Sequence, residues 1–102
     1  MIRHCVLIRA RPDREPGELE AVLVDLAALR QRLPGMLSFA SGADVSPEGL
    51  QRGYTHAFTI DFTDLAARDA YLADADHKAL GARLVATAEG GRNGILVLDF
   101  ES

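Results

Sequence analysis

Hydrophobic and polar residues alternate along three stretches of the chain, residues 2–10, 36–45 and 53–62. This two-residue period predicts three β-strands, because successive strand side chains point to opposite sides. A fourth stretch, residues 95–100, is apolar on both sides except at Asp99 and predicts a final strand. The apolar sides carry Ile2, His4, Val6 and Ile8 in the first stretch, Leu37 and Phe39 in the second, and Tyr54, His56, Phe58, Ile60 and Phe62 in the third.

A three- to four-residue period follows the first of these stretches and predicts an amphipathic helix that starts near Glu18. Pro34 and Gly35 end this helix, and Pro12 and Pro16 end the strand before it. The apolar positions of the helix are Leu19, Val22, Leu23, Leu26, Leu29 and Leu33.

A second helical region is expected after the third strand, with Thr63 as its N-cap. The segment 73–77, Ala-Asp-Ala-Asp-His, interrupts this region. Either Asp74 or Asp76 can cap a further helical segment, which the glycine-rich residues 89–94 terminate.

The element order is therefore βαββαβ, which is the α+β, ferredoxin-like arrangement. In that topology the sheet is antiparallel, with strand order 4-1-3-2, and the helices cover one of its faces. The opposite face carries Cys5, Leu7, Thr55, Ala57 and Thr59. Because that face is too apolar to stay in contact with water, we expect the sheet of a second copy to cover it in a homodimer.

The composition is that of one globular domain spanning residues 1–102, with 48% hydrophobic and 25% charged residues. The net charge is −4 and the charges are interleaved, so we expect neither a nucleic acid nor a membrane as partner. No apolar run approaches a membrane-spanning length, and the first residues do not resemble a signal peptide. Cys5 is the only cysteine, which favours a reducing compartment and predicts a cytoplasmic protein.

Four segments stand out along the chain, in the order MIRHCVLIR, DVSPEGLQRGYTHAFTIDF, YLADADH and ILVLDF. Together they resemble the stress-responsive dimeric α/β-barrel (Dabb) family, and the likeness runs over almost the whole chain. The resemblance implies a ferredoxin-like protomer whose sheet packs on a second sheet to form a dimeric α/β barrel. It does not imply one activity, since the family includes plant stress proteins, uncharacterised bacterial proteins and a polyketide cyclase that needs no cofactor.

Comparison with that cyclase implies site residues in this chain. Its catalytic histidine resembles His77 and its tyrosine partner resembles Tyr71. Two further histidines of its pocket resemble His4 and His56, and a carboxylate resembles Asp99. The family often has His-Pro-x-His before the second helical segment, whereas residues 74–77 here are Asp-Ala-Asp-His. That departure weakens any transfer of the cyclase's substrate to this chain.

The strand pairing places His4 near Asp99, because the beginning of the first strand lies beside the end of the fourth. A carboxylate there would fix the tautomer of the imidazole and raise its basicity. The alternative is that the two residues satisfy each other as a structural pair.

Tyr71 and His77 would point about 120° apart on one continuous helix, so they meet only if the segment 73–77 breaks the helix. With that break, His77 would remove a proton from an activated carbon, and the Tyr71 hydroxyl would hold the developing enolate oxygen. The alternative is that Tyr71 is a core residue and His77 a surface cap.

His56, with Phe58 and Tyr54 on the same side of its strand, is predicted to line a ligand pocket, or to anchor a loop if there is no cavity. His56 and His4 are expected roughly 13 to 20 Å apart along the sheet. That separation argues against a three-histidine metal site, and we expect no metal and no cofactor.

Three functions fit these features: a cofactor-independent cyclase, isomerase or lyase-type carbon-acid catalyst, a non-catalytic structural or stress-protective dimer, and a monooxygenase-like barrel working without cofactor. An enclosed cavity touching Tyr71, His77 and His56 would favour an enzyme. A sheet–helix interface filled by Phe58, Phe62 and Leu26 would favour the structural dimer.

Overall fold

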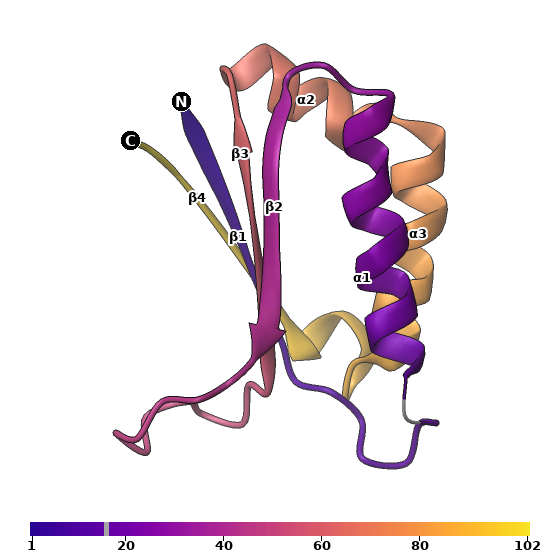
Figure 1. Cartoon of the computed structure of the whole chain (residues 1–102). Helices are drawn as coiled ribbons and strands as arrows, with labels where there is room; N and C mark the ends of the chain where they lie inside the picture. Colours follow the sequence, from indigo (N-terminus) through magenta and orange to yellow (C-terminus); the bar gives the residue numbers. More distant parts are fainter. Residues whose placement is uncertain (16) are drawn as a thin grey trace.

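The computed structural model describes residues 1–15 and 17–102, and it contains one four-stranded sheet with the helices packed on one face (Figure 1). The expected strand-ending role of Pro16 lies outside the described residues. In chain order the elements are β1 (Ile2–Ile8), α1 (Glu18–Ala28), the 3-10 helix η1 (Leu29–Gln31), β2 (Met36–Ala43), β3 (His56–Phe62), α2 (Leu65–Ala73), α3 (Ala75–Thr87), the 3-10 helix η2 (Gly91–Gly94) and β4 (Ile95–Glu101).

The sheet order is β2-β3-β1-β4, and each neighbouring pair is antiparallel. Read from the other edge, this is the predicted order 4-1-3-2, so the ferredoxin-like fold is confirmed. In the register of the central strand, His4 lies between Ile60 of β3 and Asp99 of β4. The pairing of the first and last strands therefore places His4 directly beside Asp99.

The hydrophobic core lies between the sheet and the helices. Along β1, buried and half-buried residues alternate as predicted, with Ile2, His4, Val6 and Ile8 facing the helices. The predicted stripe of α1 packs on them. The buried apolar residues are Ile2, Val6, Ile8, Leu19, Val22, Leu23, Leu26, Leu29, Met36, Phe58, Ile60, Phe62, Tyr71, Leu84 and Ala88.

The predicted interruption of the second helical region is confirmed at Asp74, which has an extended backbone with ψ of 133° and separates α2 from α3. Its side chain accepts a hydrogen bond from the His77 backbone N–H at 3.0 Å, so Asp74 rather than Asp76 caps α3. The predicted cap of α2 is wrong. Asp64, not Thr63, accepts from the Ala67 N–H, because α2 begins at Leu65 and Asp64 is the residue directly before it.

Two strand predictions also need correction. The third strand begins at His56 rather than near residue 53, because Arg52 and Gly53 have φ of 54° and 86° and turn the chain before the ladder starts. Tyr54 therefore precedes the strand. Leu37 is exposed instead of sharing the core side with Phe39, because a β-bulge shifts the register between Met36 and Ser38.

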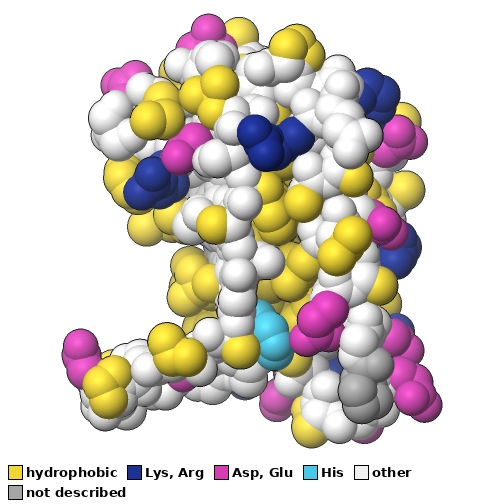
Figure 2. Space-filling view, viewed as in Figure 1, with side chains coloured by type: hydrophobic (Ala, Val, Ile, Leu, Met, Phe, Trp, Pro, Cys, Tyr) yellow, Lys and Arg dark blue, Asp and Glu magenta, His cyan; other side chains and the backbone are white. Residues whose placement is uncertain are grey.

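The sheet face away from the helices, called here the open sheet face, carries Cys5, Leu7, Ala57, Thr59, Leu96, Leu98 and Phe100. Leu98 is 62% exposed on it. Residues 44–55, called here the β2–β3 arm, project from the end of the sheet where β2 stops, on the side away from the helices (Figures 1 and 2). Among the helices of residues 1–15 and 17–102, none has the length and apolar character needed to cross a bilayer.

Candidate functional site

A histidine, a carboxylate and an arginine form a connected group at the edge of the core. His4 of β1 is 5% exposed, and its Nδ1 lies 2.7 Å from Asp99 Oδ1 on β4. Arg68 of α2 donates to the other oxygen, Asp99 Oδ2, at 2.8 Å. Partial burial pushes the pKa of Asp99 up, but the hydrogen bonds from Arg68 and His4 outweigh it and hold that pKa below its ordinary value. Asp99 is thus a carboxylate, so His4 Nδ1 carries the hydrogen and donates it.

Tyr71 and His77 meet at the α2–α3 break, as the sequence predicted for an interrupted helix. Their ring centroids are 4.1 Å apart, and the Tyr71 ring also lies 5.8 Å from the His4 ring, edge to face. Tyr71 is 1% exposed, whereas His77 is half-buried. The four proposed catalytic residues therefore form one continuous line, from His77 through Tyr71 and His4 to Asp99.

Burial sets the protonation of this pair. It lowers the pKa of His77 by more than the hydrogen bond with the Leu72 backbone raises it, so the neutral imidazole is favoured. Burial also raises the pKa of Tyr71, so its hydroxyl keeps its proton and remains a hydrogen-bond donor. His77 Nδ1 is buried and has no partner of full hydrogen-bond geometry within the described residues, although the Leu72 backbone interacts with the ring strongly enough to raise its pKa in part. This nitrogen lies at the boundary of the core, where a polar group of a ligand would form a hydrogen bond with it.

An ion-pair cluster fixes the position of His77 from outside. Arg32 donates to both carboxylate oxygens of Asp74 at 2.8 Å and to Asp76 at 2.9 Å. Asp74 in turn caps the backbone N–H of His77. These hydrogen bonds, first from Arg32 and then from the His77 backbone, lower the pKa of Asp74 to about 2. The start of α3 is thereby tied to the end of η1.

The three predicted ligand-binding residues do not join this group as a set. Phe58 is buried in the core, stacked on Phe39 at 5.3 Å. His56 lies four register positions from His4 along the sheet, and its Nδ1 is 2.8 Å from Thr55 Oγ1. Tyr54 belongs to the connection before β3, with the Arg9 guanidinium 6.0 Å from its ring.

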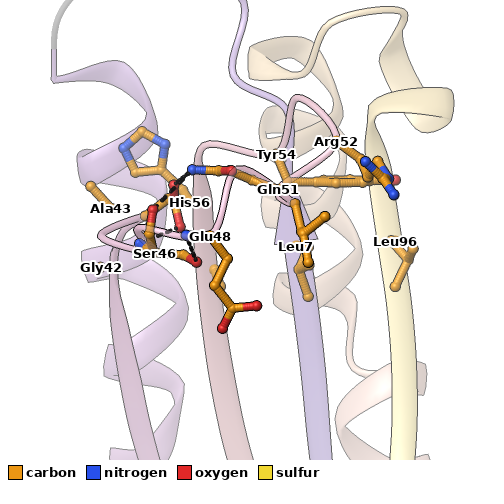
Figure 3. Close-up of a pocket in the computed structure, with 13 residues that line it drawn as sticks. Leu7, Gly42, Ala43, Ser46, Glu48, Gln51, Arg52, Tyr54, His56 and Leu96 are labelled. Carbon is orange, nitrogen blue, oxygen red and sulfur yellow. Dashed lines mark hydrogen bonds between the residues drawn. The ribbon is translucent and has the colours of Figure 1, made fainter.

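A hollow of about 430 Å³ lies between the β2–β3 arm and the open sheet face (Figure 3). His56, Tyr54 and Gln51 line its polar side, and Leu7 and Leu96 form part of its apolar floor. A smaller hollow of about 170 Å³ reaches Arg68 and Asp99 from the solvent side. Neither hollow is lined by Tyr71 or His77.

The sheet–helix interface itself is filled by side chains. Phe58, Phe62 and Leu26 are 3%, 0% and 1% exposed. Within residues 1–15 and 17–102, no three histidine, cysteine, aspartate or glutamate side chains are placed to hold a metal ion.

Residues 2–102 match the family described as Stress responsive A/B Barrel Domain, or Dabb. The chain belongs to this family. The resemblance drawn from the four sequence segments is thereby confirmed over nearly the full length.

Three relatives are similar to this Dabb domain over nearly its whole length. It is 28% identical over 100 residues to the stress-response A/B barrel domain-containing protein HS1 of Arabidopsis thaliana, covering 98% of this chain and 88% of that protein. A solved dimeric ferredoxin-like protein of unknown function from Jannaschia sp. CCS1 is 32% identical with a TM-score of 0.92, covering 99% and 98% of the two chains. A hydroxynitrile lyase from Passiflora edulis has a TM-score of 0.85 at 22% identity, over 97% and 90%, and shares the fold.

Two residues of the site, Arg68 and Arg32, were not predicted from the sequence. Arg68 stands three positions before Tyr71, so both lie on one side of α2, and that spacing was a signal for their proximity. Arg32 follows η1, and its contact with Asp74 depends on how two helices pack, which no local pattern encodes.

Proposed function

We propose that this Dabb domain binds a small, partly apolar molecule beside α2 and α3 and acts on it as a cofactor-independent acid–base catalyst of the cyclase, isomerase or lyase type. The observation that carries the proposal is the buried Nδ1 of His77 beside the Tyr71 ring, which has no partner of full hydrogen-bond geometry among the residues that the structure describes. An unsatisfied buried polar atom costs about 1–3 kcal/mol, so its retention favours a ligand-binding role.

The proposed chemistry is proton removal from a carbon next to a carbonyl group. Neutral His77 accepts the proton, the C–H electron pair moves toward the carbonyl oxygen, and the Tyr71 hydroxyl donates a hydrogen bond to the resulting enolate. His4, held by Asp99, lies on the other side of the Tyr71 ring and supports the position of that ring. Return of the proton to carbon, or loss of a leaving group, completes the reaction.

Access requires movement, because Tyr71 is almost fully buried in this structure. The α2–α3 connection at Asp74 is the segment whose displacement would expose both rings, since it is held by surface ion pairs rather than by core packing. Phe58 would then form an apolar wall of the site. His56 and Tyr54 border the separate hollow under the β2–β3 arm, so they would contact a different part of any ligand, or none.

A structural or stress-protective dimer is the second candidate, and one observation favours it. The interface between sheet and helices is filled at Phe58, Phe62 and Leu26, the condition that a non-catalytic protein would meet. The fold accommodates an enzyme as well, since a hydroxynitrile lyase shares it. The two candidates differ in whether the site at His77 takes up a small molecule.

For assembly, we propose a homodimer formed through the open sheet face. Solved relatives are described as dimeric ferredoxin-like proteins, and the apolar side chains of this face are uncovered in the single protomer. Burial of such a face against its copy is the arrangement that removes the most apolar surface from water.

The function is tested by screening small aromatic and polyketide-like acids for binding, using thermal shift and native mass spectrometry. The screen is repeated on His77→Ala and on Lys78→Ala, an exposed neighbour on the same helix turn. We expect at least one acid to stabilise the wild type and Lys78→Ala but not His77→Ala. Equal binding by His77→Ala would refute the site, and the absence of any binder would favour the structural dimer.

A further inference from the structure

Arg32 fastens the junction between α2 and α3 to a distant part of the chain. Its guanidinium donates to both carboxylate oxygens of Asp74 at 2.8 Å and to Asp76 Oδ2 at 2.9 Å. These two partners lie 42 and 44 positions further along the sequence. Within what the structure describes of the chain, the side-chain hydrogen bonds that join residues 72–78 to another segment all come from Arg32. The attachment of the junction by hydrogen bonds therefore depends on one arginine.

Apolar packing adds little at the junction itself. Leu72, Ala73 and Ala75 are exposed, so this turn of the chain removes little apolar surface from water. The buried Tyr71 ring lies directly before the turn, and the His77 ring after it lies 4.1 Å from the Tyr71 ring. The turn thus connects the two rings of the proposed site while its own residues face the solvent.

Asp74 has two tasks at this turn. Its Oδ2 accepts from the His77 N–H at 3.0 Å, one of the first N–H groups of α3, which have no acceptor inside their own helix. The same carboxylate takes both hydrogen bonds of the Arg32 fork, the geometry in which arginine–carboxylate pairs are strongest. The Asp74 side chain is 13% exposed and the Arg32 side chain 49%, so water reaches the pair mainly from the arginine end. Loss of Arg32 would therefore loosen the residue that caps α3.

We propose that Arg32 is a latch: its hydrogen bonds to Asp74 and Asp76 hold the start of α3 in place, and the α2–α3 junction opens toward solvent only when they break. The inference rests on the proposed function, because an open junction would uncover Tyr71 and His77 to the small molecule that they are proposed to bind. Arg32 is then a positioning residue, since it acts on His77 through Asp74 and needs no contact with the ligand.

The experiment is amide hydrogen exchange followed by NMR on the ligand-free, full-length protein. The His77 N–H reports opening of the junction, because its acceptor is the Asp74 side chain, and the amides of the central strand β1 report global unfolding. Arg32→Gln removes the charge and Arg32→Lys keeps it. Arg83→Gln is the matched control, because it breaks a similarly exposed Arg–Asp pair that joins α3 to α1 away from the junction.

Asp74→Asn separates the latch from the helix cap. Asparagine caps a helix about as well as aspartate, so this variant keeps an acceptor for the His77 N–H but loses the charge that pairs with Arg32. A latch requires Asp74→Asn to behave like Arg32→Gln, whereas a cap alone would leave it like the wild type. Combining the two changes should open the junction no further than the faster single variant, since both break the same pair.

In the wild type, we expect the His77 N–H to exchange faster than the amides of β1, because the junction opens without global unfolding. Arg32→Gln and Asp74→Asn should each speed exchange at His77 by at least about threefold, and Arg32→Lys by less than either. Arg83→Gln can speed exchange in β1 by lowering global stability, but it should change exchange at His77 by less than about threefold. An ion pair that only adds to global stability would speed exchange in β1 and leave His77 unchanged.

The latch is refuted if the His77 N–H exchanges no faster than β1 in the wild type, because the junction would then open only when the whole protein unfolds. It is also refuted if either Arg32→Gln or Asp74→Asn speeds exchange at His77 by less than about threefold, or if Arg83→Gln speeds it as much as they do. None of these readouts needs a ligand. A failed ligand screen would therefore leave the latch standing, and a failed latch would leave ligand binding at His77 to its own test.

Discussion

At the scale of single residues, the unusual feature is a line of polar side chains in an otherwise apolar core. His4 and Tyr71 are buried, and His77 has a buried nitrogen without a hydrogen-bond partner in the described part of the chain. Apolar residues of similar volume would pack as well without the desolvation cost. These positions therefore reduce stability for a reason that core packing alone does not supply.

The pH dependence of stability tests the burial of His77. Because burial lowers the pKa of His77 in the folded protein, the unfolded chain takes up a proton there first as the pH falls. The contribution of His77 to stability is therefore full above its ordinary pKa of about 6.5 and decreases as the pH falls below that value. Urea denaturation at pH 8, 7, 6 and 5.5 measures it.

The control for that titration is His77→Gln, which keeps a polar side chain but cannot titrate. The unfolding free energy of the wild type minus that of the variant should decrease between pH 7 and pH 5.5, because only the wild type can take up a proton at position 77. A difference that is constant over this range would contradict the burial of the His77 ring.

At the scale of elements, the helix and strand order was predictable, because each element repeats its own pattern over several residues. The pairing of His4 with Asp99 followed from antiparallel register alone, and the meeting of Tyr71 with His77 followed from the interruption at residues 73–77. Element starts were less predictable. The start of β3 depends on left-handed backbone at Arg52, a non-glycine residue that gives no sequence signal for that conformation.

Gly35 controls how closely β2 approaches α2. Its carbonyl accepts from the Thr63 N–H at 3.0 Å, and a Cβ added there would overlap the Cβ of Ala67 in α2. Gly35→Ala should therefore destabilise the protein by about 1–3 kcal/mol, since the helix must shift away from the strand. Urea denaturation of the variant measures this loss.

Gly81 provides the matched control, because it lies within α3 and a Cβ there meets no atom within 4 Å. Gly81→Ala should stabilise the protein by about 1 kcal/mol through the better helix propensity of alanine. If Gly35→Ala were as stable as the wild type, the close contact between β2 and α2 would not be needed for folding.

At the scale of the whole molecule, one group of exposed apolar side chains lies on the β2–β3 arm and the open sheet face. Val45 and Leu50 project from the β2–β3 arm, and Leu96, Leu98 and Phe100 line the open sheet face. The hollow under the arm shares Leu7, Ala57 and Leu96 with that face, so the arm and the sheet border one continuous surface (Figure 3). A patch of this kind marks an interaction site. The sequence indicated this face from strand alternation, but the arm's part in it depends on tertiary geometry.

Leu98→Asp tests whether the open sheet face forms the dimer. A carboxylate buried there without a partner should weaken dimerisation by at least about a hundredfold, giving a monomer at micromolar concentration in sedimentation equilibrium. Val24→Asp is the matched control, since Val24 is 67% exposed on α1, on the other side of the sheet, and this variant should remain dimeric. A Leu98→Asp protein that dimerises like the wild type would place the interface elsewhere. The monomer would also separate the roles of the two sides of the sheet, because the line from His77 to Asp99 lies within one protomer.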